Sequence, residues 1–255
     1  MTRLRFLLTP RWLGLFAFAV LVVATCVRLG FWQLDRLEQR RALNATIRQG
    51  LAAPPVPLDA LAGVGSDRLG YRRVEVTGTY DPEHEVLLYG RALNGEPGHH
   101  VLTPLLLERP LDGARAILVD RGWVPFELGT PPVAPAAPPG GTVTVAGFLL
   151  PSPGEADVVI ERDPSGRPLT VAHDEPAAIG PELGLSLFPL ALQLQRQTPP
   201  QPSDLPAPVP PPELSEGPHL SYAIQWFTFA AIAVVGCVLL VRRELRDRAR
   251  AGDPG

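Results

Sequence analysis

LSYAIQWFTFAAIAVVGCVLLV, at residues 220–241, is a run of 22 amino acids without a formal charge. A helix needs about 20 apolar residues to cross the hydrocarbon core of a bilayer, so this stretch predicts a transmembrane helix. A second apolar stretch occupies residues 12–29 and resumes after Arg28 through Phe31, Trp32 and Leu34. We therefore predict membrane-spanning helices at residues 12–34 and 219–241, with a polar domain at residues 35–218 between them.

The first apolar stretch also has the features of a cleavable signal peptide, which shows the same basic start and apolar run. However, no small-residue cleavage site of the A-x-A type follows it. Residues 23–26, VATC, depart from a lipoprotein cleavage box because Thr25 precedes the cysteine. We expect a retained anchor, with a lipoprotein as the alternative.

Charge is distributed unevenly along the chain. The leader up to Arg28 carries four arginines and no acid, and the tail from Arg242 carries five arginines and three acids. Residues 31–219 carry 14 arginines and 23 acids, a net charge of −9. Basic flanks stay in the cytoplasm while long loops are translocated. The sequence thus predicts a multi-pass protein of the cell (inner) membrane, with cytoplasmic ends at residues 1–11 and 242–255 and an extracytoplasmic domain.

The acidic domain argues against a nucleic-acid partner, because a phosphate-binding surface needs concentrated basic charge. The two cysteines, Cys26 and Cys237, lie in the apolar runs, and antiparallel helices place them near opposite ends of the membrane. The exported domain therefore has no disulfide and no thiolate metal site. Membrane lipid is the partner that the composition itself implies.

The polar domain shows the pattern of successive short strands. Residues 71–80 alternate in polarity, and apolar runs follow at residues 85–91, 99–108, 114–125 and 142–150. Asp-Pro, Asn-Gly and Pro-rich breaks separate them, and no helical pattern of about 10–15 residues intervenes. The predicted fold class is membrane α+β, with two transmembrane helices flanking an extracytoplasmic, mainly antiparallel β domain that forms a small sheet or barrel.

The end of the domain is less regular. A short helix is expected at residues 175–184 and a further strand at residues 187–195. Two proline-dense stretches, at residues 131–139 and 199–212, are expected to be extended and mobile. The second has eight prolines in 14 residues and leads to the second membrane helix.

Five blocks of the sequence resemble, in order and spacing, the signature blocks of the Surfeit locus protein 1 family: LGFWQLDR (29–36), YRRVEVTGTY (71–80), GHHVLTPLLL (98–107), ILVDRGWVP (117–125) and HLSYAIQWF (219–227). The resemblance runs from about residue 12 to 243. It implies a chaperone of the respiratory chain that assists the assembly of cytochrome c oxidase and binds haem a. The implied partners are the catalytic subunit of the oxidase and the haem a synthesis machinery.

The last block has a physical reading of its own. Within a helix His219, Tyr222 and Trp226 fall within about 60° of one another, so they share one face at the outer edge of the membrane. Histidine is a usual axial ligand of haem iron, and flat aromatic side chains suit a macrocycle. We therefore expect His219 to be the metal ligand and Tyr222 and Trp226 to contact the cofactor. The alternative is an ordinary interfacial aromatic belt with a polar residue at the helix start.

The first helix offers a possible counterpart. Arg28, Trp32 and Arg36 recur every fourth residue and form a stripe where this helix leaves the membrane. Two guanidinium groups there suit the propionates of a haem held by His219, and they suit lipid phosphates equally well. Gln33 is expected to close the interface between the helices by hydrogen bonding.

Asp120, Arg121 and Trp123 form the most distinctive cluster of the domain. In a strand ending at Pro125 we expect Arg121 and Trp123 on one face and Asp120 on the other, as an internal ion pair or a docking surface. His84, His99, His100 and His173 are weak candidates for ligation, since His99 and His100 point to opposite faces of a strand.

The sequence contains no nucleophile elbow and no metal-ligand spacing, so we do not expect an enzyme. Three functions remain open. The first is a haem-a-binding assembly chaperone. The second is a structural factor that scaffolds an oxidase subunit without touching haem, and the third is a membrane-tethered receptor for an unrelated ligand.

Overall fold

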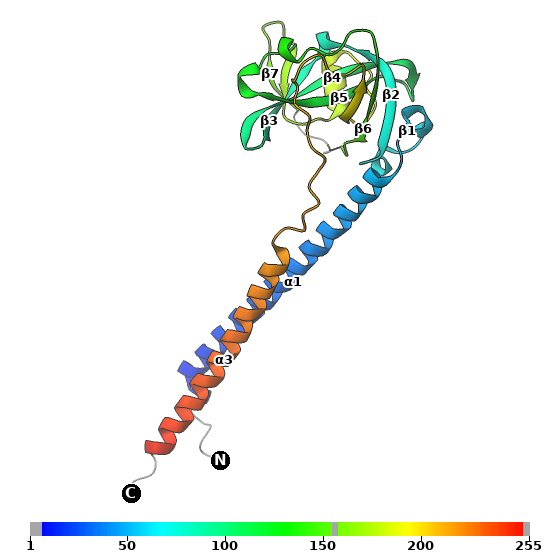
Figure 1. Ribbon diagram of the computed structural model, residues 1–255. Coiled ribbons are helices and arrows are strands. Elements are labelled where there is room, and N and C mark those ends of the chain that lie inside the picture. The colour runs from blue at the N-terminus through cyan, green and yellow to red at the C-terminus, as the bar shows by residue number, and fades with distance from the viewer. Residues whose placement is uncertain (1–6, 153, 155–157, 252–255) are drawn as a thin grey trace. The chain divides into compact units, whose positions relative to one another are not determined.

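A computed structural model describes residues 7–152, 154 and 158–251. The chain divides into two compact units. The first unit comprises residues up to Ala45 and from Leu214 onward, and it contains most of one long helix and all of another. The second unit, Thr46–Glu213, is the β domain (Figure 1).

The helical unit is built from α1 (Pro10–Ala52) and α3 (His219–Ala251), which run antiparallel (Figure 1). Each contains a segment with mean hydropathy above 2, and few residues of these segments are buried within the protein. Large apolar side chains such as Phe18, Leu21 and Ile232 are more than 60% exposed. Such an apolar surface is typical of lipid contact, so two apolar helices flank a β domain, as the sequence predicts.

The sequence predicts an end of the first helix near residue 34, but α1 continues to Ala52. The region from residue 35 that was expected to be β-rich therefore begins with a helix, at residues 35–52. This extension is polar, and its buried residues include Leu37, Asn44 and Ile47. Pro54 follows Ala53, and a residue before proline avoids the α conformation, which accounts for the end of the helix.

Small residues bring the two helices close together. The buried positions of α1 include Cys26, Gly30 and Leu37, and α3 buries Ala223 and Ala230. A side chain at Gly30 would meet the ring of Phe227, since an ideal Cβ there lies 2.7 Å from two ring atoms. Close contact through small residues is a common way for helices to associate in membranes.

Five strands close into a barrel in the β domain. They are β2 (Arg73–Tyr80), β4 (Glu96–Leu111), β5 (Ala114–Pro125), β6 (Thr142–Leu149) and β9 (Leu192–Thr198). Their order is β2-β6-β9-β5-β4, and a pairing of β2 with β4 closes the ring. All of these pairs are antiparallel except β5 with β9. The predicted barrel and its mainly antiparallel character are confirmed.

The closing pair requires a glycine. Gly78 of β2 lies opposite Leu107 of β4, and an ideal Cβ at Gly78 lies 2.2 Å from the carbonyl oxygen of Leu106. No side chain fits at that distance, so only glycine lets the two strands approach. Closure leaves these strands without a free edge along the paired residues.

Four short elements extend the sheet beyond the barrel. β1 (Val56–Pro57) pairs in parallel with β2, and β3 (Val86–Leu93) pairs with β4. β8 (Pro168–Val171) joins β3, and β7 (Val159–Arg162) joins β8. The expected strand at residues 85–91 corresponds to β3, whereas β1, β7 and β8 were not predicted. Helix α2 (Pro176–Leu183) confirms the expected helix and packs through Ile179 and Leu183 against β3, β4 and β8.

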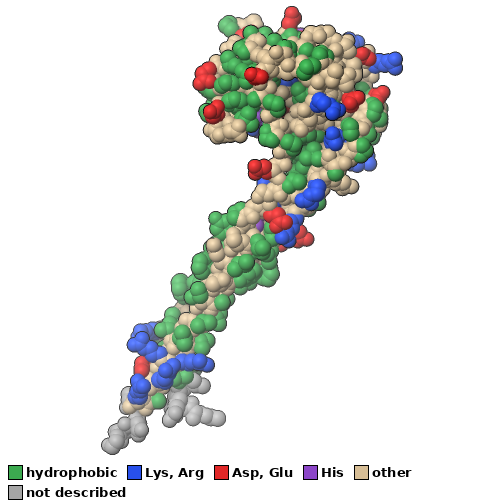
Figure 2. Space-filling model, viewed as in Figure 1, with side chains coloured by type: hydrophobic (Ala, Val, Ile, Leu, Met, Phe, Trp, Pro, Cys, Tyr) green, Lys and Arg blue, Asp and Glu red, His purple; other side chains and the backbone are tan. Residues whose placement is uncertain are grey.

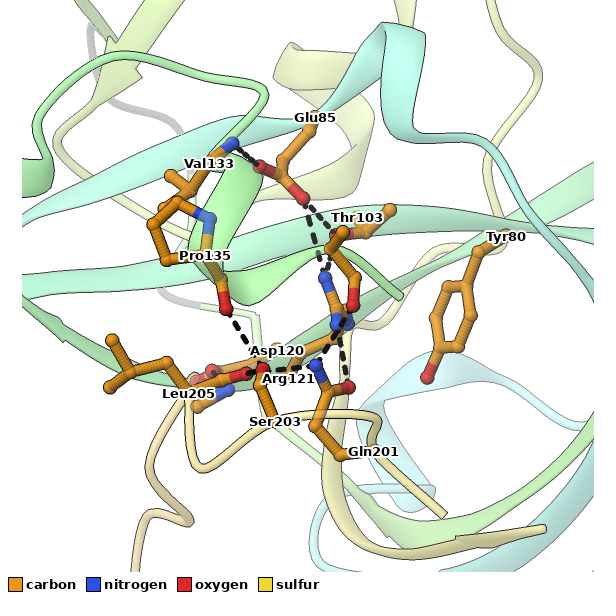
Figure 3. A network of polar contacts seen from close by, with 12 residues as sticks. Tyr80, Glu85, Thr103, Asp120, Arg121, Val133, Pro135, Gln201, Ser203 and Leu205 are labelled. Atoms are coloured by element: carbon orange, nitrogen blue, oxygen red, sulfur yellow. Dashed lines mark hydrogen bonds and ion pairs between the residues drawn. The ribbon is translucent and has the colours of Figure 1, made fainter. Parts of the chain in front are cut away.

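A buried polar network crosses the interior of the β domain (Figure 3). Nη1 of Arg121 lies 3.4 Å from Oε2 of Glu85, and both side chains are almost completely buried. The same Glu85 oxygen accepts a hydrogen bond of 2.8 Å from Thr103, and Oε1 accepts one of 2.8 Å from the backbone N–H of Val133. Burial raises the pKa of Glu85, while these bonds and Arg121 oppose that change. The guanidinium also lies 5.2 Å above the ring of Tyr80.

The proline-dense stretches are held to the domain through this network. Nη2 of Arg121 donates to Oε1 of Gln201 at 2.8 Å, and Nε2 of Gln201 donates to the carbonyls of Ala137 and Leu205. Ser203 donates to the carbonyl of Pro135 at 2.8 Å. The two stretches are thus joined to each other and to the barrel (Figure 3).

These contacts do not fit the expectation of two mobile stretches, and the first stretch is not extended throughout. The first turns into a short 3-10 helix at Ala134–Ala136 and buries Val133 and Ala136. In the second, Ala207 pairs with Trp123 through two backbone hydrogen bonds of 2.7 and 2.8 Å. Proline removes a donor but leaves a carbonyl, so side-chain amides and hydroxyls can anchor such a segment.

Replacement of Glu85 by Leu should destabilise the protein strongly, because Arg121 is left buried without its charged partner. We expect a loss of about 3–5 kcal/mol in the free energy of unfolding. Glu85→Leu combined with Arg121→Met should recover much of that loss, since both charges are then removed. The measurement is denaturant unfolding of the detergent-solubilised chain, followed by circular dichroism.

Glu83→Leu is the matched control, because Glu83 is an exposed residue in the adjacent turn. It should change the unfolding free energy by no more than about 0.5 kcal/mol. If Glu85→Leu is as mild as this control, the Glu85–Arg121 pair does not hold the domain together.

Candidate functional site

The helical unit places His219 at the first position of α3, opposite Gln33 of α1. Nδ1 of His219 lies 2.8 Å from Oε1 of Gln33. Gln33 is buried, and His219 is partly buried. Gly217, at a φ of 68°, and Pro218 turn the chain into the helix just before the histidine. The two side chains thus join the helices at this level.

This contact favours one tautomer of His219. An amide oxygen can only accept a hydrogen bond, so Nδ1 is the donor. The neutral ring then keeps its lone pair on Nε2. Histidines that bind metals commonly donate from one nitrogen to a fixed acceptor and bind through the other. The arrangement is therefore suited to ligation of a metal by Nε2.

The segment before α3 is tied to the polar extension of α1. Arg41 donates a bidentate pair of hydrogen bonds to the carboxylate of Glu216, with N–O distances of 3.0 and 2.9 Å. Asn44 donates to the carbonyl of Ser215 at 3.1 Å. The guanidinium of Arg41 holds the pKa of Glu216 below its ordinary value. These contacts fix the chain a few residues before His219.

The aromatic residues expected to accompany His219 lie on the following turns of the same helix. Tyr222 is 46% exposed and Trp226 is partly buried. The ring of Trp226 meets that of Phe229 edge-on, with centroids 5.9 Å apart. The observed helix keeps His219, Tyr222 and Trp226 on one face, with aromatic surface left open to a ligand or to lipid.

The stripe formed by Arg28, Trp32 and Arg36 lies on another part of α1. All three are exposed, and the Arg36 guanidinium lies 5.6 Å from the Trp32 ring centroid. Trp32 is about 100° around the helix from Gln33. Arg28 and Trp32 line a shallow depression on this flank. Among the described contacts none joins the stripe to His219, so a role toward a ligand of His219 stays a prediction.

The cluster in the β domain differs from the expected alternation. His100 pairs with Trp123, and Leu102 pairs with Asp120, so β5 has one extra residue at this point. Asp120 and Trp123 therefore share a face, and Arg121 points into the barrel toward Tyr80. The expectation that Arg121 and Trp123 share a face is wrong because the bulge resets the alternation. Of the two alternatives expected for this cluster, an internal ion pair is observed, but the partner of Arg121 is Glu85 and not Asp120.

The remaining histidines have separate surroundings. His99 is buried and stacks on Phe126 with ring centroids 5.1 Å apart, and burial lowers its pKa. Nδ1 of His100 lies 2.8 Å from Oδ2 of Asp120. His100 and His99 lie on opposite faces of the strand, as predicted. His84 lies 2.7 Å from Asp81. Within the described part of the chain, no group of three or more His, Cys, Asp or Glu side chains could hold a metal ion.

Arg41 and Asn44 were missed because the polar stretch after residue 34 was assigned to the domain. A signal was present in the sequence: Gly30, Leu37 and Asn44 are spaced by seven residues, and all three are buried. Such spacing indicates a helix that keeps one face against a neighbour. Glu85, Thr103 and Gln201 had no local signal, because only tertiary folding brings them to Arg121.

Comparisons with known proteins agree with these features. The profile of the SURF1 family matches residues 20–231. An uncharacterized SURF1-like protein of Mycobacterium tuberculosis is 34% identical over 265 residues, covering 100% of this chain and 93% of that protein. A SURF1-like protein of Monosiga brevicollis is 26% identical over 246 residues, covering 90% and 88% of the two chains. A SURF1-like protein of Rickettsia bellii is 35% identical over 99 residues, 38% of each chain.

The family match includes both Gln33 and His219, and it extends through the barrel between them. The two apolar helices, together with the family match, indicate a membrane protein. The chain therefore belongs to the SURF1 family, and this membership implies a role as an assembly factor for cytochrome c oxidase.

Proposed function

We propose that this protein binds haem a through His219 and passes it to the catalytic subunit of cytochrome c oxidase during assembly. The observation that carries the proposal is the hydrogen bond of 2.8 Å between His219 Nδ1 and Gln33. When Nδ1 donates this bond, the lone pair of the neutral imidazole is on Nε2, and this tautomer can bind iron through Nε2. When bound, haem a supplies the redox iron of the oxidase.

The surroundings of His219 support the same ligand. Tyr222 and Trp226 offer flat surfaces on the face of α3 that carries the histidine, where an apolar macrocycle gains contact area. Arg28 and Arg36 are exposed cations near the level of Gln33 along α1, and charge-assisted bonds from them would suit the propionates. The proposed role is to hold and position the cofactor, and it needs no catalytic step from the protein.

A structural assembly factor is the second candidate. The bond between Gln33 and His219 joins two helices and would stabilise their association without any cofactor. In that case the protein holds an oxidase subunit through its helices and barrel. The absorption spectrum of protein purified from cells that make haem a separates the two candidates.

We also propose that the protein resides in the cell inner membrane, with both termini in the cytoplasm and the barrel outside. The support is the distribution of arginine, which is concentrated before and after the two apolar segments. In this orientation His219 lies at the outer edge of the membrane.

Reporter fusions should test this orientation directly. A fusion at either terminus should be active only with a cytoplasmic reporter, and an insertion at Gly154 should report export. The reason is that basic flanks resist translocation. Mature protein that begins at Cys26 would contradict two retained spans and would indicate a lipoprotein.

Replacement of His219 by Ala should remove the bound-haem spectrum or shift it strongly while the protein still inserts in the membrane. Gln33→Leu should weaken haem binding about 10- to 100-fold, the usual effect of losing the partner of a ligating histidine. Gln49→Leu is the matched control, because Gln49 is an exposed residue of the same helix. Binding is measured by absorption titration of the purified protein.

Trp226→Ala should reduce affinity less than His219→Ala, because stacking contributes contact area but no bond to iron. Oxidase should accumulate with less haem a in cells that carry His219→Ala. An unchanged haem spectrum in that variant would reject the ligand assignment. A wild-type protein that retains no haem would favour the structural assembly factor.

A further inference from the structure

A second polar site lies at the other end of the helix pair, where α1 begins and the last turns of α3 pass beside it. Arg11, Trp12 and Phe18 of α1 line a groove together with Leu240 and Arg243 of α3. We call it the Arg11–Arg243 groove. Figure 2 shows basic side chains gathered at this end of the helices, next to a long apolar surface.

Arg11 and Arg243 are at most weakly paired within the described part of the protein. Neither makes a hydrogen bond among the described contacts, and the ion pair of Arg243 with Asp247, which also lines the groove, is exposed and has an N–O distance of 3.8 Å. Glu244 also lines the groove, but it is bound to Arg248 at 2.7 Å. Its charge is therefore largely compensated.

The walls below the two guanidinium groups are apolar. Phe18 is 65% exposed and Leu240 is 47% exposed, and both belong to the apolar segments of the helices. Trp12 is partly buried at the same end, and tryptophan favours the depth of the lipid head groups. The groove thus combines the guanidinium groups of Arg11 and Arg243, the indole of Trp12 beside them, and apolar side chains further along the two helices.

We propose that the Arg11–Arg243 groove binds an anionic phospholipid, with its phosphate between the two guanidinium groups and its acyl chains along Phe18 and Leu240. Basic pockets between transmembrane helices are suited to anionic head groups. A zwitterionic lipid adds a cation to the head group, and Arg11 and Arg243 would repel that cation. This site is independent of haem binding.

The test uses the full chain, purified in detergent after reconstitution with equal amounts of phosphatidylglycerol and phosphatidylcholine. Mass spectrometry then counts the lipid retained per protein. The wild type should retain phosphatidylglycerol preferentially. Arg11→Gln and Arg243→Gln should each weaken its binding about fivefold, the effect of losing one arginine near an anionic surface.

Arg246→Gln with Arg250→Gln is the matched control, since it removes two charges from the same end of α3 but none from the groove. If this pair reduces lipid retention as much as Arg11→Gln with Arg243→Gln, the attraction is general and the site is rejected. Displacement of the lipid by inorganic phosphate at millimolar concentration would show a phosphate site and would also reject the proposal.

Melting temperature gives a second measurement on the same proteins. Phosphatidylglycerol should raise the melting temperature of the wild type and of the control pair, and have little effect on the groove variants. If the double groove variant does not fold, the two single variants answer the question. Equal stabilisation of all variants by the lipid would overturn the proposal.

Discussion

A buried polar side chain between apolar helices needs a hydrogen-bond partner, and the pairing of Gln33 with His219 supplies one across the two helices. A buried amide left without a partner would cost about 1–3 kcal/mol, so the bond fixes the register of the two helices at this level. Gly30 and Ala223 permit the close approach that the bond needs, because neither has a bulky side chain. The position of His219 and the packing of the helix pair are therefore set together.

The sequence allowed the two apolar helices and the main strands of the barrel to be predicted, because each depends on a local pattern. The polar part of α1 was not predicted, since the expected length was taken from the thickness of a bilayer. Nothing in residues 35–52 interrupts a helix before Pro54, and Leu37 and Asn44 continue the buried spacing of Gly30. The spacing of buried residues therefore indicates a helix that continues beyond the membrane, whereas the length of the apolar segment indicates only the part within it.

Closure of the barrel and the docking of the proline-rich stretches had no local pattern. Closure depends on a contact between Gly78 and Leu106, which lie far apart in the sequence. The proline-rich stretches look like free linkers because they lack donors, but Gln201 and Ser203 supply hydrogen bonds to their carbonyls. Arg121 was recognised as distinctive, whereas the bulge in β5 that separates it from Trp123 depends on the register with β4.

The polar contacts of the helix pair gather on one side of His219, where Arg41 and Asn44 hold the segment before α3. On the other side the buried contacts of α3 are apolar, beginning at Ala223. An amphiphilic ligand such as a haem suits such a boundary, because its iron and propionates are polar and its macrocycle is not. The partner of His219 is moreover a neutral amide, which raises the basicity of a ligating histidine less than a carboxylate does. In the proposed function, iron held in this way would be bound less tightly, which would favour its transfer to another protein.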